Sequence, residues 1–408
     1  MRTILVVGKA FSDLTSYLDA HGYDWVTLRD IKTTKYPDKR MRRRIVCDFS
    51  NEAGIVAALE KLKCKPDAVI VVYENYVLPA AIIAEKLGLP GMPIRAAEAC
   101  TDKYLMRSRF ALAPEKISPD FAEVSCEEDL DAFADTHRFP LILKPANLMK
   151  SLLVTKAASM NELIQNYRKA MESIRAVYEK YAPNRVPKLI IEEYLEGPVH
   201  SVDAFVDAGG TPHIIEGIVD YQTGYDIGYD DNFHYSRLMP TRLTGAEQRA
   251  FLRCADLACR ALGMRSSPAH IEIIVTTEGP RIVEIGARNG GYRERMYALA
   301  RGIDITGNAL AVALDEPVDI TPNKDEPVAV LELFPKEAGT YDGIKNIGKL
   351  KELPSLYQFH EKVKLGDIVG KSSDGYKMCA MVFLHNKDCG QFARDLSFVN
   401  SSVCVLTK

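Results

Sequence analysis

The sequence lacks several features that mark particular classes of protein. Its nine cysteines include no CxxC pair, and its eight histidines show no HxxxH spacing. It therefore offers neither a disulfide framework nor a zinc site built from these residues. No apolar run approaches the roughly 20 residues of a membrane helix. The strand-like stretch TILVVG starts at Thr3, so no signal peptide is expected before it. These absences favour a cytoplasmic protein, away from membranes, that binds any metal through oxygen.

The first turn after that stretch, GKAFSD, contains a single glycine. It lacks the GxGxxG pattern with which a dinucleotide pyrophosphate is bound, so a nicotinamide-dependent dehydrogenase is disfavoured. The net charge of −3 gives no general attraction to nucleic acid. One basic run, KTTKYPDKRMRRR (32–44), is interpreted as a solvated loop rather than a polyanion-binding patch. The sequence thus predicts no nucleic-acid partner.

The pattern of apolar residues predicts a mixed α/β and α+β protein of several domains. Over the first hundred residues, strands are expected at 3–8, 24–28 and 67–73, with helices at 52–62 and 79–89. This alternation is typical of a parallel, doubly wound sheet. Proline and glycine cluster at 89–103, which suggests a domain boundary there.

Further elements are expected beyond this boundary. They are strands at 139–145 and 188–197, a helix at 160–180, and a hairpin over 200–221 that turns at AGGT. Thr244 and Glu247 form a capping box at the start of a helix that runs to Leu262, and Gly263 follows its end. From about residue 320, short strands separated by glycine-containing turns indicate a small α+β domain.

The stretch HIEIIVTTEGPRIVEIGARNGG (270–291) predicts a β-hairpin that carries one carboxylate in each strand, Glu272 and Glu284. A three-residue loop pairs Thr276 with Pro280 and sets the two carboxylates opposite each other, where like charges destabilise a sheet unless a cation lies between them. A loop one residue longer would place them on opposite faces. An exposed hairpin face with two solvated glutamates is an equally good interpretation of the spacing alone.

Several motifs in order resemble the ATP-grasp superfamily of carboxylate–amine ligases. They are PDAVIVVYENYVLPAAIIAEKLGLPG, TDKYLMR, FPLILKP, LIIEEYLEGP, LGMRSSPAHIEI and GPRIVEIGARNGG, and the resemblance extends from residue 66 to 318. Within the superfamily, the sequence is most similar to the L-amino-acid ligases that make dipeptides. The resemblance implies an N-terminal α/β domain (1–100), a two-lobed ATP-grasp domain (101–318) and a C-terminal α+β domain (319–408).

The resemblance also implies roles for individual residues. Glu272 and Glu284 would bind Mg²⁺, with Mn²⁺ as an alternative, and Arg288 would act with Glu284 on the transferred phosphoryl group. Lys103 and Lys144 would bind phosphates, since a lysine ammonium is a compact point charge. The other implied contacts to ATP are Lys150, Ser151, Glu192, Glu193, Tyr194 and Leu195.

Three positions depart from the family pattern. Gly286 stands where many relatives have an asparagine that completes the metal ligands. No glycine occurs between Lys144 and Gly197, although relatives carry a glycine-rich loop there. Val199 replaces the glutamate that holds the ribose, and the neighbouring His200 is the expected substitute.

Substrate contacts are expected from Glu74, at the end of a parallel strand, where open α/β sheets bind ligands. The polar segment 221–237, with His234, could line the pocket of the amine substrate or form a surface loop. Arg293 and Arg295 are candidates to bind a substrate carboxylate.

The hypothesis is therefore an ATP-dependent, ADP-forming ligase that joins a small carboxylate to an amine through an acyl phosphate. Amino acids are the expected substrates, and a homodimer the expected assembly. The alternative is an ATP-grasp homologue that binds a nucleotide or an amino acid without catalysis.

Overall fold

The computed structural model describes residues 1–32, 43–148, 152–182 and 185–408. The N-terminal part is a four-stranded parallel sheet in the order β3-β2-β1-β4. Its strands are β1 (Thr3–Val7), β2 (Asp24–Asp30), β3 (Arg44–Cys47) and β4 (Ala68–Val71). The predicted parallel sheet is confirmed. The edge strand β3 was not predicted, because it has only four residues and directly follows the basic run.

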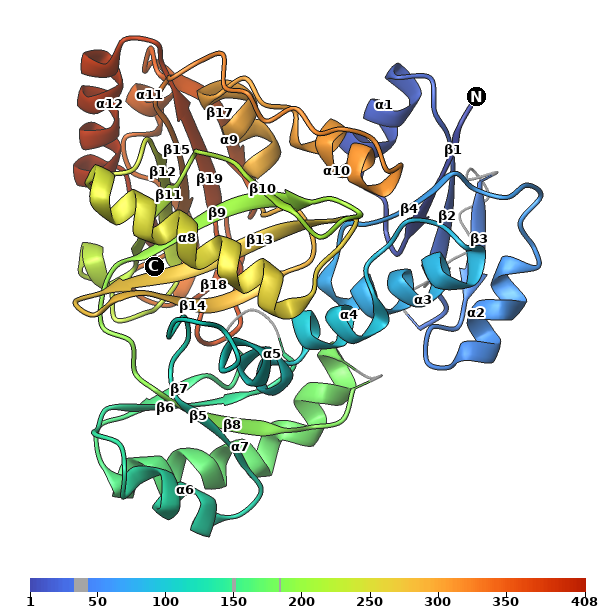
Figure 1. Ribbon diagram of the computed structural model, residues 1–408. Helices are drawn as coiled ribbons and strands as arrows, with labels where there is room; N and C mark the ends of the chain where they lie inside the picture. Colours follow the sequence, from blue (N-terminus) through green and yellow to red (C-terminus); the bar gives the residue numbers. More distant parts are fainter. Residues whose placement is uncertain (33–42, 149–151, 183–184) are drawn as a thin grey trace.

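Helices cover both faces of this sheet. On one face lie α2 (Glu52–Leu59) and α3 (Val77–Leu87), which share a core with Leu5, Val7 and Leu28. On the other lie α1 (Ser12–Ala20), which was not predicted, and α10 (Ile305–Ala313). Because α10 comes from much later in the chain, the N-terminal sheet is packed against the rest of the molecule (Figure 1).

Two short helices, α4 (Ile94–Thr101) and α5 (Lys103–Phe110), lead into a smaller lobe. Its antiparallel sheet, in the order β5-β8-β6-β7, consists of β5 (Phe121–Val124), β6 (Leu141–Pro145), β7 (Thr155–Ala157) and β8 (Leu189–Glu193). Two helices pack on it, α6 (Glu127–Ala134) and α7 (Met160–Tyr181). The buried side chains of α7 recur every three or four residues, from Leu163 to Tyr178, as an amphipathic helix requires.

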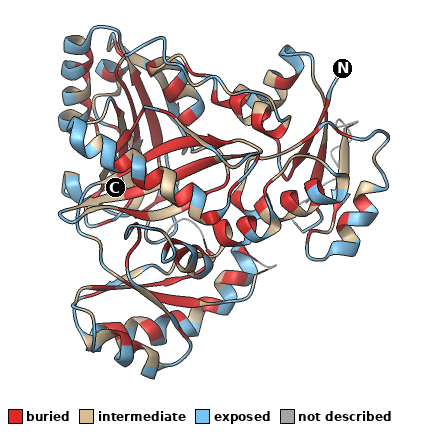
Figure 2. Cartoon of the chain, in the orientation of Figure 1, coloured by how far each residue is buried: buried red, intermediate tan, exposed pale blue. Residues whose placement is uncertain are grey.

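The largest sheet has nine strands, in the order β14-β13-β9-β11-β12-β15-β19-β17, with β10 paired to β9. The strands are β9 (Val199–Val206), β10 (Pro212–Ile214), β11 (Val219–Thr223), β12 (His234–Met239), β13 (Ser267–Thr276), β14 (Gly279–Gly286), β15 (Val328–Leu333), β17 (Leu356–Glu361) and β19 (Ala380–His385). Figure 2 shows buried residues along most of these strands.

Two helices lie on opposite faces of this sheet. α8 (Gly245–Leu262) packs on the face formed by Val202, Ile271 and Ile273. Its predicted capping box and the left-handed Gly263 at its end are confirmed. α9 (Arg293–Ala300) packs on the other face, against Phe205 and Val330.

The last ninety residues complete the fold. A three-stranded sheet of β16 (Gly339–Ile344), β18 (Ile368–Val369) and β20 (Val405–Thr407) packs with α11 (Ile347–Lys351) and α12 (Cys389–Ser402). However, β15, β17 and β19 belong to the large sheet, because β15 pairs with β12. Hydrogen bonding therefore continues across the boundary expected at residue 318, and the three-domain division stays a prediction. None of the described helices has the length and apolar character needed to cross a bilayer.

Candidate active site

The hairpin of β13 and β14 places Glu272 directly opposite Glu284, as predicted. The route differs from the expected one, because Thr276 pairs with Gly279 and the loop has two residues rather than three. A bulge at Val283 then restores the register, so that Ile273 pairs with Ile282 and Glu272 with Glu284. The carboxylates share the face of the sheet that lies opposite α8.

Arg107 of α5 uses the carbonyl group that the bulge leaves free. Its Nη2 donates to the Val283 oxygen at 2.7 Å, and its Nε donates to Oε1 of Glu192 at 2.9 Å. The side chain is fully buried, and Nη1 has no hydrogen-bond partner among the described residues. Sequence analysis missed this arginine, although it lies one helical turn after Lys103 and so on the same face of α5.

Lys103 is the first residue of α5, and its side chain contacts the hairpin of β13 and β14. Its Nζ lies 3.1 Å from Oε2 of Glu284 and donates to the Leu148 carbonyl at 3.0 Å. The charge of Lys103 lowers the pKa of Glu284. Asp102 caps the helix by accepting from the backbone N–H groups of Tyr104 and Leu105, which fixes the start of α5 beside the hairpin.

Lys144 on β6 and Glu192 on β8 form a buried pair, with Nζ 2.6 Å from Oε2. Burial lowers the pKa of Lys144 to about 8, although Glu192 opposes the shift. Burial would raise the pKa of Glu192, but the charges of Arg107 and Lys144 outweigh it and the pKa is lowered. The structure therefore brings together Lys103, Lys144 and both metal-site carboxylates around α5.

The segment after Glu192 leaves the sheet. Glu193 points away from Lys144, since its Oε2 accepts from the Asp120 backbone N–H at 2.8 Å and from Lys116 Nζ at 3.2 Å. Within the described parts of the chain, no hydrogen bond involves the backbone of Tyr194 or Leu195. These two residues could therefore present backbone groups to an adenine ring.

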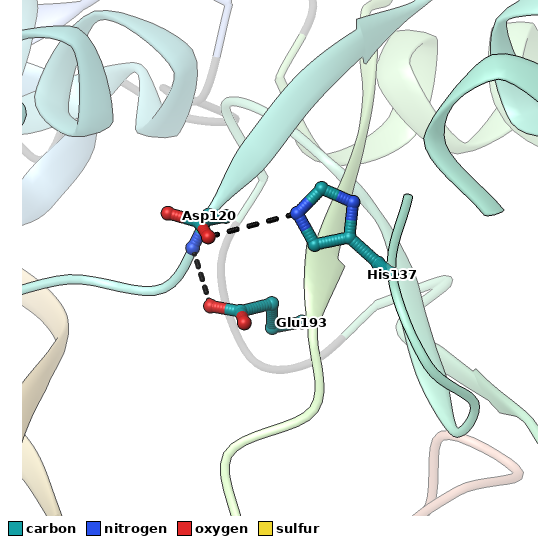
Figure 3. Close-up of side chains that lie close together, drawn as sticks. All are labelled: Asp120, His137 and Glu193. Carbon is teal, nitrogen blue, oxygen red and sulfur yellow. Dashed lines mark hydrogen bonds and ion pairs between the residues drawn. The ribbon is translucent and has the colours of Figure 1, made fainter. Parts of the chain in front are cut away.

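Glu193 also belongs to a cluster with Asp120 and His137 whose ligand atoms lie close together (Figure 3). The ammonium group of Lys116 lies 3.1 Å from Asp120 and 3.2 Å from Glu193. Because this ammonium already contacts both carboxylates, a metal ion there would have to displace it, and the cluster is a weak candidate for a metal site. Lys150 and Ser151, also expected at the nucleotide, lie outside the described residues.

The ribose contact expected from His200 is contradicted by the structure. Glu272 pairs with Ser201 on β9, so the adjacent His200 faces the opposite side of the sheet. There its ring lies edge-on to Phe251 of α8, and its Nδ1 is 2.9 Å from Oδ1 of Asp220. His200 and the two carboxylates Glu272 and Glu284 therefore lie on opposite faces of the sheet. Only the strand register shows which face each residue of β9 occupies.

The substrate roles expected of Arg293 and Arg295 are also contradicted. Arg293 is 1% exposed, and its Nη2 donates to Ser201 at 2.8 Å and to Tyr221 at 2.6 Å. It thus holds α9 on the sheet. Arg295 donates to Gln358 on β17, which is the edge strand farthest from β14. Sequence reasoning found the charges but could not foresee their partners.

Glu74 enters the site from the N-terminal sheet, within the short turn Glu74–Tyr76 that follows β4. Its Oε2 lies 3.2 Å from Nε of Arg288, and burial raises the pKa of this carboxyl group. The side chain is 8% exposed, and neither oxygen has a hydrogen-bond partner among the residues described. A Cβ atom on Gly286 would lie only 2.7 Å from Oε2 of Glu74. The glycine therefore makes room for this carboxylate.

His270 and Asp203 support Glu272 and were not found by sequence analysis. His270 Nδ1 lies 3.2 Å from Oδ1 of Asp203, and its Nε2 is 3.5 Å from Oε1 of Glu272. Burial opposes ionisation of Glu272, but the bond to His270 and nearby positive charges lower its pKa. Asp203 also accepts from the Gly290 backbone N–H at 2.8 Å, which ties the loop after Arg288 to β9. The HIE triplet was the available signal, because residues 270 and 272 share one face of a strand.

His234 lies on the same side of the sheet, edge-on to Tyr221 at 4.6 Å between ring centroids. Burial lowers its pKa, while the charge of Glu272 acts in the opposite direction. A β-bulge in β12 separates the pairing of His234 from that of Ser236. The predicted position of His234 beside the site is thus compatible with the structure, and its role stays a prediction.

The chain is similar in sequence to several known proteins. Residues 137–294 match the model of a family described as an ATP-grasp domain. The uncharacterized protein y4rH of Sinorhizobium fredii is 22% identical over 303 residues, which cover 74% of this chain and 60% of that protein. The alanine–anticapsin ligase of Bacillus subtilis is 28% identical over 234 residues, covering 55% and 49% of the two chains. The chain thus matches about half to three fifths of the length of these relatives.

Solved structures show the same fold over the whole chain. An L-amino acid ligase from Bacillus licheniformis superimposes with a TM-score of 0.82 at 18% identity, covering 100% of this chain and 99% of that one. A phosphoribosylglycinamide synthetase from Anaerococcus prevotii reaches a TM-score of 0.71 at 14% identity, with both chains fully covered. The complete described chain, including both ends, therefore follows one architecture.

Proposed function

We propose that this chain, an ATP-grasp protein, is an ADP-forming carboxylate–amine ligase that acts on amino acids. The observation that carries the proposal is the convergence of the paired carboxylates Glu272 and Glu284 with three cationic side chains. Lys103 comes from α5, Lys144 from the smaller lobe and Arg288 from the loop after β14. Similarity to the alanine–anticapsin ligase supports amide-bond formation.

The two lysines are proposed to bind the phosphates of ATP. Each is paired with a carboxylate, Lys103 with Glu284 and Lys144 with Glu192. Phosphate oxygens would add a second acceptor to each ammonium group, which has three donors. The backbone of Tyr194 and Leu195, beside Glu192 and Glu193, is proposed to meet the adenine ring.

Glu272 and Glu284 fit a divalent cation. They lie opposite each other on one sheet face, and two carboxylates in this position repel unless a positive charge is near. Oxygen donors of this kind suit Mg²⁺, and we propose that Mn²⁺ can replace it. A bound Mg²⁺ would neutralise phosphate charge during phosphoryl transfer. His270, bonded to Asp203, would keep the Glu272 carboxylate in place.

Arg288 is proposed to hold the transferred phosphoryl group on the substrate carboxylate. Its guanidinium is 25% exposed, so it is accessible from the site, and its forked donors suit phosphate oxygens. Glu74 is proposed to face the amine substrate. Its buried carboxylate lies 3.2 Å from Nε of Arg288, so a substrate in contact with Glu74 would also lie beside the residue proposed to hold the phosphoryl group. The amine would then attack the acyl carbon as the bond to the phosphate oxygen breaks.

The test is phosphate release from ATP and Mg²⁺ in the presence of pooled amino acids. Release that requires two amino acids together would establish the ligase. The variant Glu284→Gln should lose at least 100-fold of this activity while keeping its unfolding transition, because it removes one charge from the metal site without changing its shape. ATP binding without ADP formation in any pool would instead favour the non-catalytic alternative.

The assembly and location of the protein are also proposals. We propose a cytoplasmic homodimer. Light scattering coupled to size-exclusion chromatography would measure the assembly, and a mass of about 45 kDa would contradict the dimer, since the chain itself is 45.4 kDa.

A further inference from the structure

Two opposite charges lie on inner strands of the large sheet, on the face that carries Glu272. Arg237 is on β12 and Glu332 on β15, and Nη1 lies 3.1 Å from Oε1. Burying charges in the middle of a sheet is costly unless they serve a purpose. The two side chains are 12% and 14% exposed, so they are largely but not completely buried.

The guanidinium of Arg237 is held so that part of its edge is free. It lies over the rings of Tyr221, at 5.7 Å, and Tyr292, at 5.3 Å. Nη1 contacts Glu332 and donates to the His234 carbonyl at 3.0 Å. Over the described ranges, Nε and Nη2 of Arg237 make no hydrogen bond, and neither is a buried unpartnered atom. Two adjacent donors of this kind suit a carboxylate.

Glu332 presents the complementary charge. Its Oε1 accepts from the Tyr292 hydroxyl at 2.9 Å, and Oε2 makes no hydrogen bond to any described residue. Tyr292 has a φ of +65°, which a bulky side chain rarely adopts and which costs on the order of 1–3 kcal/mol. The strained backbone of Tyr292, in the loop that follows Arg288, thus coincides with the contact between its side chain and this pair.

His234 connects the pair to the metal-site carboxylates. Its ring packs on Tyr221, and the charges that act on it include Glu272, Arg237 and Glu332. Tyr221 in turn is opposite Arg237 in the strand register. The Arg237–Glu332 pair thus lies on the same face of the sheet as Glu272, with β9 and β11 between β13 and β12.

We propose that Arg237 and Glu332 bind the amino acid that acts as the amine substrate, Arg237 its carboxylate and Glu332 its ammonium group. The two charges lie side by side, and Nε and Nη2 of Arg237 and Oε2 of Glu332 make no hydrogen bond to the described residues. Such a pair of opposite charges matches a zwitterion. The substrate that is activated loses the charge of its carboxylate when the acyl phosphate forms. A site that binds a charged carboxylate therefore suits the other substrate, the amine, whose carboxylate stays ionised. The inference rests on the proposed ligase function and adds the residues that bind one of its two substrates.

The experiment measures binding separately from turnover. The protein, loaded with the non-hydrolysable analogue AMP-PNP and Mg²⁺, is titrated by calorimetry with each of the standard L-amino acids and with their α-carboxamides. At least one amino acid should bind, and its carboxamide should bind at least tenfold more weakly because the contact to Arg237 is lost. In the double variant Arg237→Met/Glu332→Met, binding of the amino acid should fall at least 30-fold, while AMP-PNP affinity is unchanged.

The double variant also separates a binding role from a structural one. Removing both charges leaves no unpaired buried charge, so the fold should be retained. Arg253→Met, which breaks the exposed pair with Glu115, is the matched control and should change neither affinity. Equal binding of amino acids and carboxamides, or wild-type affinity in the double variant, overturns the inference. So does the absence of binding by every amino acid. Amino-acid binding without phosphate release from any pool would instead count against the ligase function alone.

Discussion

At Gly286, the absence of a side chain leaves room for the carboxylate of Glu74 beside Arg288. The two residues come from different parts of the chain, one after β4 and the other at the end of β14. The departure from the asparagine found in many relatives is therefore part of the packing of this site.

We predict that Gly286→Ala lowers ligase activity at least tenfold with little loss of stability. The added Cβ would lie 2.7 Å from Oε2 of Glu74, at the end of a flexible side chain that can move away. Phosphate release and the midpoint of thermal unfolding would be measured together. Gly291→Ala is the control, because a Cβ there would meet no heavy atom within 4 Å among the described residues, its two chain neighbours aside. Equal activity in both variants would contradict the role given to Glu74.

Lys144 should make nucleotide binding depend on pH. Burial lowers its pKa to about 8 from 10.5, so the free protein loses this positive charge as the pH rises through 8. We predict that ATP affinity falls between pH 7.5 and 9, and that Lys144→Arg removes most of this dependence because arginine stays charged. Calorimetric titration at several pH values would measure it, and identical profiles for the two proteins would disprove it.

The same residue affects stability in the opposite direction. Because the folded-state pKa of Lys144 is below its unfolded value, the unfolded chain binds more protons between pH 8 and 10.5. The contribution of this group to the free energy of unfolding therefore rises with pH over that window. The wild type should therefore gain stability relative to Lys144→Met between pH 7.5 and pH 9.5, which urea unfolding of the two proteins at both pH values would measure.

Among the helices and strands, α5 connects the smaller lobe to the hairpin of β13 and β14. Arg107 contacts Glu192 on β8 and the Val283 carbonyl of the bulge in β14. The helix thereby links the nucleotide lobe to the strands that carry both metal-site carboxylates. The bulge has two effects, since it sets Glu284 opposite Glu272 and provides the acceptor for Arg107.

We predict that Arg107→Met destabilises the protein by about 3–5 kcal/mol, the range for removing one partner of a buried charge pair. Urea unfolding would give the change in free energy. Arg253→Met, at an exposed pair, should cost no more than about 1 kcal/mol. A similar loss of unfolding free energy in the two variants would mean that the buried contacts of Arg107 stabilise the protein no more than an exposed ion pair does.

At the scale of the molecule, the site depends on how the N-terminal sheet is packed on the rest of the chain. Leu310 and Ala313 of α10 share a core with Ile4, Leu18 and Trp25. This contact fixes β4, and thus Glu74, relative to the loop of Arg288. The residues proposed to bind ATP lie elsewhere, on α5, the smaller lobe and the hairpin.

We therefore predict that Leu310→Ala lowers phosphate release more than it lowers ATP affinity. The buried leucine should cost about 2–5 kcal/mol of stability, mainly by loosening the contact of the N-terminal sheet. Calorimetry with ATP and the phosphate assay would be compared at a temperature well below unfolding. Leu112→Ala, at a side chain that is 80% exposed, is the control. A parallel loss of ATP binding would contradict this division of roles.

Elements whose signals are local could be predicted from the order of residues alone. The alternation of β1 to β4 with helices, the capping box at Thr244 and the carboxylate in each strand of the hairpin all depend on residues close together in the chain. The order of motifs was equally informative, and it led to the ATP-grasp domain that the comparisons show. Lys103 and Lys144 were predicted as phosphate contacts in this way, and their role stays a prediction.

Only the tertiary structure decided which of these charges face the site. A two-residue loop and a bulge replaced the expected three-residue loop, and the parity of β9 turned His200 toward α8. Arg293 was predicted at the substrate but is buried against Ser201 and Tyr221. The physical reason is the same in each case. Strand register and buried partners depend on contacts between residues far apart in the sequence, whereas helix caps and strand periodicity depend on near neighbours.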